Sequence, residues 1–228
     1  MEEFKKHLYS VREIDFYECK RWILDKHYAK RMPSISYSFG LYKLNELIGI
    51  CTFGSGANLN MKGMVKGYDA IELNRLVIKS QPKNTLSYFV SKCLKLLPSP
   101  IVIVSYADPN NNHSGYIYQA TNWIYTGKGT RKDGGIDSGV SQFIKDGKNY
   151  HGKSVCELVG SSSKDEAKKH GFERVYLSPK HRYLYFRGTK KDIKKMRKAN
   201  PYPILDYPKD ENIRYDDTAK IETQLILF

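Results

Sequence analysis

The stretch from Ser105 to Gly127 carries the residue types in this chain that are best suited to chemistry. Its sequence, SYADPNNNHSGYIYQATNWIYTG, sets a carboxylate (Asp108) and an imidazole (His113) among amides and aromatic rings. An imidazole can take part in acid/base chemistry near neutral pH, or it can support a ligand. For each of these residues taken alone, the competing interpretation is turn formation or core packing.

The neighbouring elements predict where this stretch lies. Ile101–Tyr106 is an apolar, β-branched run that predicts a strand, Pro109 and three asparagines predict a loop, and Gly115–Tyr125 predicts a short helix. Polar groups therefore follow the carboxyl end of a buried strand. Ligand binding and catalysis favour that position in mixed α/β sheets.

The rest of the chain predicts further strands and helices around this strand. Apolar periodicity, caps and turn residues predict a helix at Asp15–His27, a hairpin of Ile35–Leu44 and Leu47–Phe53, a strand at Ala70–Ile78, a helix at Thr85–Leu97, a strand at Tyr183–Phe186 and a basic helix at Lys190–Lys198. We expect an α/β (α+β) fold, a mixed sheet flanked by helices with a basic C-terminal extension. Residues 1–150 form the catalytic core in this prediction. Residues 151–228 complete the sheet and carry the basic helix and tail.

Composition points to a polyanionic partner. The 228 residues include 38 Lys and Arg against 24 Asp and Glu, a formal net charge of +14, together with 18 tyrosines. Such a balance favours nucleic acid first and an anionic membrane surface second, whereas the competing interpretation is a merely soluble basic protein. The four cysteines are scattered without zinc-site spacing, and no signal peptide or bilayer-length apolar run is present. We therefore expect a cytoplasmic protein without membrane attachment.

The basic excess is concentrated near the C-terminus. The segment RGTKKDIKKMRK holds seven basic residues and one acid. Its cations surround the predicted helix, which favours neutralisation of the phosphates of double-stranded DNA over base reading. A solvated charged face is the alternative. The predicted DNA-binding residues are Lys190, Lys191, Lys194, Lys195, Arg197 and Lys198, and Arg131, Lys132, Lys168 and Lys169 are candidates to extend the surface.

The order of the predicted elements resembles the GCN5-related acetyltransferase superfamily. In that superfamily a strand and its following helix diverge from the next strand to form a cofactor cleft. The usual acyl-CoA loop contains glycines, whose backbone amides hold a pyrophosphate. Here the corresponding loop, Ser80–Ser87, has no glycine, and Pro82 removes one amide donor. The loop therefore argues against acyl-CoA.

Three segments together resemble the Mom family of phage DNA-modifying proteins. They are DKHYAKRMPS, ELNRLVI and the polar stretch SYADPNNNHSGYIYQATNWIYTG, and the C-terminal HRYLYFRGTKKDIKKMRKANPYPILDYPK is also typical of the family. The resemblance implies an acetyltransferase-like fold and addition of a carbamoylmethyl (acetamido-type) group to N6 of adenine, which protects phage DNA from restriction. It also implies an iron centre.

The resemblance assigns roles to individual residues. The His-Tyr pair of the family falls on His27 and Tyr28, its metal-linked aspartate on Asp108, and a later metal-linked tyrosine on Tyr118. The implied metal ligands are Tyr28, Asp108 and Tyr118, and oxygen ligands of these types suit a hard iron ion. For His27 and His113 we consider metal ligation, acid/base or supporting roles, and ordinary hydrogen bonding.

Further residues are candidates for substrate or cofactor binding. Glu72, Asn74 and Arg75 lie on one predicted strand, where alternation places Arg75 opposite Glu72 and Asn74; a cross-strand ion pair is the alternative. Ser105 can position a base or a donor group, with strand packing as the competing interpretation. An adenine must leave the DNA stack to expose its amine to a cleft, and the candidate stacking residues are Trp123, Tyr116 and Tyr42.

Three functions are therefore compared. The leading hypothesis is a Mom-like DNA adenine N6-modifying transferase. The alternatives are an acetyltransferase-like transferase with a non-DNA substrate and a DNA-binding protein without catalysis. The sequence names neither the group donor nor the DNA sequence context. Its Tyr- and Pro-rich tail is compatible with a homodimer but does not require one.

Overall fold

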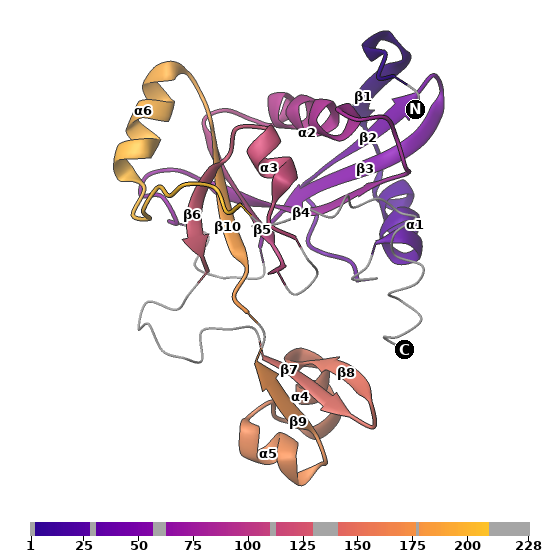
Figure 1. Cartoon of the computed structure of the whole chain (residues 1–228), viewed down its shortest axis with the longest axis vertical. Coiled ribbons are helices and arrows are strands. Elements are labelled where there is room, and N and C mark those ends of the chain that lie inside the picture. The colour runs from indigo at the N-terminus through magenta and orange to yellow at the C-terminus, as the bar shows by residue number, and fades with distance from the viewer. Residues whose placement is uncertain are drawn as a thin grey trace.

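The computed structural model describes residues 3–27, 31–56, 63–109, 113–129, 141–176 and 178–209. They form a large lobe around one sheet and a small lobe with a sheet of its own (Figure 1). The strand order in the large sheet is β1-β2-β3-β4-β5-β10-β6. Its strands are β1 (Tyr9–Glu13), β2 (Tyr37–Lys43), β3 (Glu46–Gly54), β4 (Ala70–Ile78), β5 (Ile101–Ala107), β6 (Ile124–Lys128) and β10 (His181–Arg187).

The sheet is mixed, as the sequence predicts. Strands β4 and β5 run parallel, and the other neighbouring strands in this sheet are antiparallel. The parallel pairing joins Ala70–Glu72 to Val102–Val104, and the two strands then separate. Just beyond the paired positions, the Ser105 hydroxyl donates to the Leu73 carbonyl oxygen at 2.9 Å. A side chain thus takes over from backbone pairing where the strands diverge.

Helices cover both faces of the large sheet. α2 (Thr85–Leu96) and α3 (Tyr116–Ala120) pack on the face that carries Ile103 and Tyr183. α1 (Phe16–Lys26) and α6 (Lys190–Ala199) lie on the other face, where α1 buries Ile23 and α6 buries Met196. A short 3-10 helix, η1 (Lys6–Leu8), precedes β1. The structure confirms the predicted helices near residues 16–26, 85–96 and 190–199, including the Asp15 side chain that caps α1 by accepting from the Glu18 amide at 2.9 Å.

A β-bulge in β4 corrects one sequence prediction. Thr52 pairs with Arg75 and Phe53 with Leu73, so β4 has an extra residue, Asn74, at this point. Leu76 returns to the face that carries Leu73, and Arg75 therefore lies on the opposite face, with Glu72. The predicted placement of Arg75 opposite Glu72 was wrong because a bulge resets the two-residue alternation of a strand.

The predicted helix Gly115–Tyr125 was also wrong in its length. Helix α3 ends at Ala120, and Asn122 adopts a left-handed conformation with φ 62°. The chain then enters β6, which pairs with β10. Tyr118 and Tyr125 therefore lie on different elements, α3 and β6, instead of on one helix.

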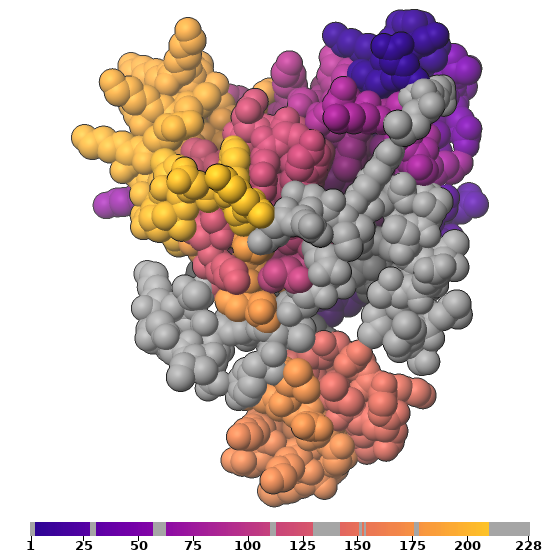
Figure 2. Space-filling model, viewed as in Figure 1, coloured from indigo at the N-terminus to yellow at the C-terminus, as the bar shows by residue number. Residues whose placement is uncertain are grey.

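The small lobe is inserted between β6 and β10. It consists of β7 (Ser141–Lys145), β8 (Lys148–His151), α4 (Gly152–Val159), α5 (Lys164–Lys169) and β9 (Glu173–Tyr176). Its strand order is β8-β7-β9, and Phe143, Val155, Ala167 and Phe172 form a separate core. The predicted boundary between residues 1–150 and residues 151–228 falls within β8. Figure 2 shows this lobe beside the large one.

No helix among the described ranges is long and apolar enough to cross a membrane.

Candidate active site

Asp108 follows directly on the carboxyl end of β5 and pairs with Lys180. The residue is 9% exposed, and its Oδ2 lies 3.2 Å from Lys180 Nζ. The pairing follows from the sheet, because His181 is opposite Ala107 in the antiparallel β5–β10 register. Lys180 is fixed further by its carbonyl oxygen, which accepts from the Gly129 amide at 2.8 Å. The ammonium group of Lys180, which precedes the neighbouring strand β10, thus balances the charge of the buried Asp108 carboxylate.

Tyr118 on α3 contacts the same strand through Ser105. Both residues are buried, and their hydroxyl oxygens lie 2.7 Å apart. The single Ser105 hydroxyl proton points to the Leu73 carbonyl in the 2.9 Å bond, so the Tyr118 hydroxyl donates to Ser105 when both bonds are made. This arrangement links α3, β5 and β4 at the point where the two strands separate.

An aromatic cluster next to Tyr118 was not predicted from the sequence. The ring of Tyr183 lies 5.1 Å from that of Tyr118 and 5.2 Å from that of Tyr125, measured between centroids. The Tyr125 hydroxyl is 2.8 Å from Nδ1 of His181, and both residues are buried. The Tyr183 hydroxyl donates to the Ser114 carbonyl oxygen. Because β6 and β10 are separated by the small lobe in sequence, local patterns gave no signal for this cluster.

Two of the predicted stacking residues are in the core. Trp123 is 0% exposed and packs between Tyr118 and Tyr185, with centroid distances of 5.1 and 5.6 Å. Tyr42 is 6% exposed beneath the Arg12 guanidinium. The protein already covers both rings in this structure, so their assignment as stacking residues stays a prediction that would require the rings to become exposed. Tyr116, at 59% exposure, is accessible.

The first part of the predicted site lies at the end of α1. His27 follows α1 and is 5% exposed, whereas Tyr28 lies outside the described residues. The chain beyond it is held against β4: the Asn74 amide donates to the Ser34 carbonyl oxygen at 2.7 Å, and Arg75 donates to the Arg31 carbonyl oxygen at 2.8 Å. Asn74 and Arg75 therefore contact the backbone at Ser34 and Arg31, respectively.

The remaining candidates lie on the loop after β5 and on β4. The His113 amide donates to the Asp108 carbonyl oxygen at 3.1 Å, which closes the loop after β5. Glu72 lies near Tyr106 on the face of the large sheet that α6 covers. Burial, together with the Glu72 carboxylate, raises the pKa of the Tyr106 phenol to about 12. Tyr106 is therefore a neutral hydroxyl at physiological pH.

The described part of the predicted ligand set does not form a metal site by itself. It offers one carboxylate, Asp108, and one phenol, Tyr118, which contact Lys180 and Ser105, respectively. Within the ranges that the structure describes, no group of three or more His, Cys, Asp or Glu side chains is placed to hold an ion. Because Tyr28 lies outside these ranges, the predicted set of three ligands stays a prediction.

Helix α6 presents the predicted cationic surface. Its six basic side chains are exposed, while Met196 is buried and Ile193 packs beside it. Thr189 and Asp192 form a capping box at its start, with the Thr189 hydroxyl donating to Asp192 Oδ2 at 2.6 Å. The helix projects at one edge of the large lobe in Figure 2.

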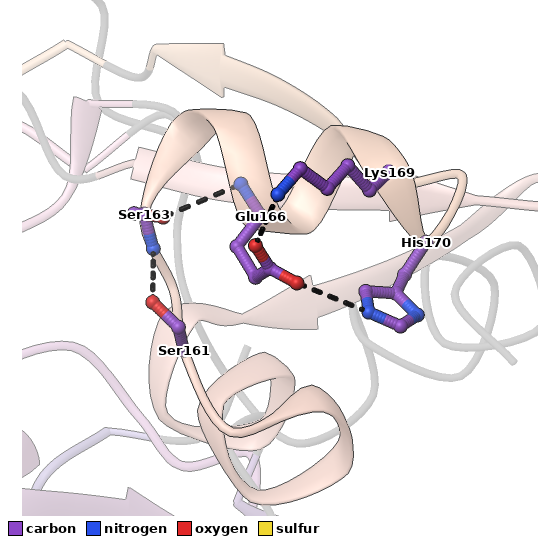
Figure 3. Close-up of polar contacts among 5 residues, drawn as sticks. All are labelled: Ser161, Ser163, Glu166, Lys169 and His170. Atoms are coloured by element: carbon purple, nitrogen blue, oxygen red, sulfur yellow. Dashed lines mark hydrogen bonds and ion pairs between the residues drawn. The ribbon is translucent and has the colours of Figure 1, made fainter.

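The other cations predicted to extend this surface differ from those of α6. Arg131 and Lys132 lie outside the described residues. On α5, Lys169 Nζ lies 2.9 Å from Glu166 Oε2, and His170 contacts the other oxygen at 3.4 Å (Figure 3). Lys169 therefore already has a carboxylate partner.

Comparisons with known proteins show which family this chain resembles over most of its length. The model of the Mom protein family matches residues 8–209. Methylcarbamoylase mom of Escherichia phage Mu is 26% identical over 212 residues, which cover 87% of this chain and 83% of that protein. The crystal structure of a ribosomal-protein-S5-alanine acetyltransferase from Vibrio fischeri is similar with a TM-score of 0.44 and 10% identity, covering 83% of this chain and 98% of that one. The family match includes both the end of β5 and α6.

Proposed function

This chain belongs to the Mom protein family, and from that premise we propose that it modifies the N6 amine of adenine in DNA. The transferred group in this proposal is carbamoylmethyl (acetamido-type), and the modification protects phage DNA from host restriction. The observation that carries the proposal is the family match over residues 8–209, and the 26% identity to a relative named a methylcarbamoylase supports it.

The carboxyl end of β5 is the proposed reaction site. Replacing one hydrogen of the N6 amine releases a proton, and Asp108 and His113 are the proton-accepting groups that this segment contributes. Asp108 is held by Lys180, and Tyr118 is held by Ser105, so both functional groups have a fixed starting geometry. The group donor is not assigned.

Double-stranded DNA is the proposed partner. The exposed cations of α6 suit contacts with phosphates, which would hold the duplex in a sequence-independent way. The target adenine must be extruded before its amine can enter a protein site. Tyr116, exposed on α3 two residues before Tyr118, is the aromatic residue that we assign to contact the extruded base.

The iron that the family resemblance implies is part of this proposal. Its ligands would be Tyr28, Asp108 and Tyr118, whose carboxylate and phenolate oxygens suit a hard ion. In this role the ion would act as a Lewis acid near the reacting amine.

Expression in a bacterium, followed by digestion of the genomic DNA and mass spectrometry of the nucleosides, tests the proposal. We expect a modified deoxyadenosine with the wild type and a loss of about 100-fold or more with Asp108→Asn, because removal of a group that acts on the reacting atoms typically costs that much. Asp25→Asn, on the exposed surface of α1, is the control and should leave the yield unchanged.

Two outcomes would count against the proposal. Unmodified DNA from folded, iron-loaded wild-type protein would contradict adenine modification. A full yield from Asp108→Asn would leave the activity standing but remove Asp108 from the reaction site. Either outcome counts only if the protein tested is soluble and folded, which for Asp108→Asn means the same thermal midpoint as the wild type.

A further inference from the structure

Lys180 lies where the two lobes and the proposed reaction site meet. It immediately precedes β10, whose first residue, His181, pairs with β5 on one side and β6 on the other. The hydrogen bond from the Gly129 amide to the Lys180 carbonyl oxygen, 2.8 Å long, joins the chain that leaves β6 for the small lobe to the chain that returns from it. The backbone of Lys180 is therefore held from two directions.

The side chain of Lys180 is directed to Asp108 from this anchored position. Its ammonium contacts Oδ2 of the carboxylate at 3.2 Å, and the two side chains are 35% and 11% exposed. A charge-assisted hydrogen bond of this kind fixes orientation as well as charge. Rotation of the Asp108 carboxyl group would break the contact, so Lys180 restrains the orientation of this carboxylate.

We propose that Lys180 is a positioning residue for the adenine modification described above. By holding Oδ2, it presents the rest of the Asp108 carboxylate in one orientation to the reacting amine. This inference rests on the proposed function, because it assigns to Lys180 a part in that reaction. Lys180 acts through Asp108 and makes no contact with the substrate in this scheme.

Lys79 supplies a matched control for the removal of Lys180. Its ammonium also contacts a carboxylate, that of Glu46, and its side chain is 36% exposed against 35% for Lys180. Lys79 follows β4 at the end remote from the paired positions Ala70–Glu72. Lys180→Met and Lys79→Met thus remove the same group from two lysines of similar exposure, one paired with the exposed Glu46 (66%) and the other with the buried Asp108 (11%).

The experiment follows the rate at which modified deoxyadenosine accumulates in a bacterium, per folded protein, for the wild type, Lys180→Met, Lys180→Arg and Lys79→Met. Fluorescence anisotropy with a labelled duplex and a thermal melt of each purified protein complete the set. We expect Lys180→Met to lower the rate by about 100-fold, since a displacement of about 1 Å at a reacting group can cost that much. Duplex affinity should stay within about 2-fold of the wild type, because most of the phosphate contacts are assigned to α6.

The two remaining variants separate positioning from a structural role. Lys180→Arg keeps a cation of different shape and should recover part of the rate, whereas Lys79→Met should match the wild type. A Lys180→Met rate per folded protein equal to the wild type would overturn the inference while leaving the proposed function intact. A Lys180→Arg rate no better than that of Lys180→Met would overturn it as well. A wild type that leaves DNA unmodified would contradict the proposed function, and this inference with it.

Discussion

The carboxyl end of β5 and helix α6 hold their charged groups in opposite ways. At β5, Asp108 is 9% exposed and its carboxylate contacts Lys180, which immediately precedes β10 and lies 72 positions further along the chain. On α6 the cations are exposed, and none of them has an ion pair among the described residues. At the end of β5 the charged groups pair with each other and fix the local geometry. On α6 the charged groups are exposed and can contact a partner.

This difference separates two parts of the proposed activity. Buried polar groups are costly unless paired, so the partners at β5 fix where each oxygen lies. Exposed lysines remain hydrated and mobile until they meet phosphates, and their effect on affinity depends on salt. Substitutions at β5 should therefore change the reaction rate, and substitutions on α6 should change salt-dependent binding.

The largest effect is expected for Tyr118→Phe. The change removes the hydroxyl that lies 2.7 Å from Ser105, and with it the proposed iron ligand. We expect loss of iron and of adenine modification, together with a decrease of about 1 kcal/mol in the free energy of unfolding for the lost hydrogen bond. Metal analysis of the purified protein, nucleoside mass spectrometry and denaturant unfolding measure the three quantities.

Tyr88→Phe provides the control for Tyr118→Phe. The Tyr88 hydroxyl donates to the Tyr9 carbonyl oxygen at 3.3 Å, on α2 away from the end of β5. Its removal should cost a similar amount of stability and leave iron and modification unchanged. Equal iron in Tyr118→Phe and the wild type would remove Tyr118 from the ligand set.

An intermediate effect is expected when two cations of α6 are removed. Lys194→Gln combined with Lys198→Gln should weaken duplex binding and reduce the slope of log K against log salt concentration by up to about 2, because each phosphate contact contributes about 0.9. Fluorescence anisotropy at several salt concentrations measures the slope. The rate at saturating DNA should change little, since the end of β5 is untouched.

Two Lys→Gln substitutions on α5 test whether the effect on the salt dependence of duplex binding is specific to α6. Lys169 is paired with Glu166 at 2.9 Å, so Lys168→Gln combined with Lys169→Gln should change the slope less. If the α5 pair lowers the slope as much as the α6 pair, the assignment of DNA binding to α6 is wrong.

Local sequence patterns were sufficient for much of the fold. Helix α1 begins after a capping Asp15, and β4 covers the run from Ala70 to Ile78 that alternation and β-propensity indicated. Helix α6 could be predicted because Thr189 and Asn200-Pro201 mark its ends. These signals are contained within one element and its immediate neighbours.

The features that the sequence did not predict depend on distant partners. Residues 124–128 form β6 because β10 supplies hydrogen bonds from across the small lobe, and β1 forms because β2 does the same. The bulge at Asn74 arises from its pairing with β3. Tertiary pairing of this kind overrides local propensity.

The candidate site shows the same limit. Asp108 and Tyr118 were identified from one contiguous segment and its resemblance to a family, whereas Lys180 lies in none of the segments that carry the resemblance, and His181, the first residue of the C-terminal segment, was assigned no role. Their relation to the site follows from the antiparallel register that places His181 opposite Ala107. Only knowledge of strand order could have revealed these residues.

The smallest effect is expected at the capping box of α6, where it depends on pH. The Thr189 hydroxyl and amide donate to Asp192 Oδ2 at 2.6 and 3.0 Å, and these hydrogen bonds lower the pKa of Asp192. A carboxyl group whose pKa is lower in the folded than in the unfolded protein stabilises the fold fully above its unfolded pKa. That stabilisation is lost as the pH falls through the lower, folded value.

Asp192→Asn should therefore be less stable than the wild type at pH 7, and the difference should shrink as the pH falls below the usual carboxylate range. Thermal melts of both proteins between pH 7 and pH 3 measure it. Thr189→Ala removes one of the two donors, so its own stability should depend less on pH in this window than that of the wild type. A difference between Asp192→Asn and the wild type that stays constant over the window would show that the carboxylate charge does not stabilise α6. In that case the helix that presents the DNA-binding cations would depend on its packing through Met196 and Ile193 and not on this charge.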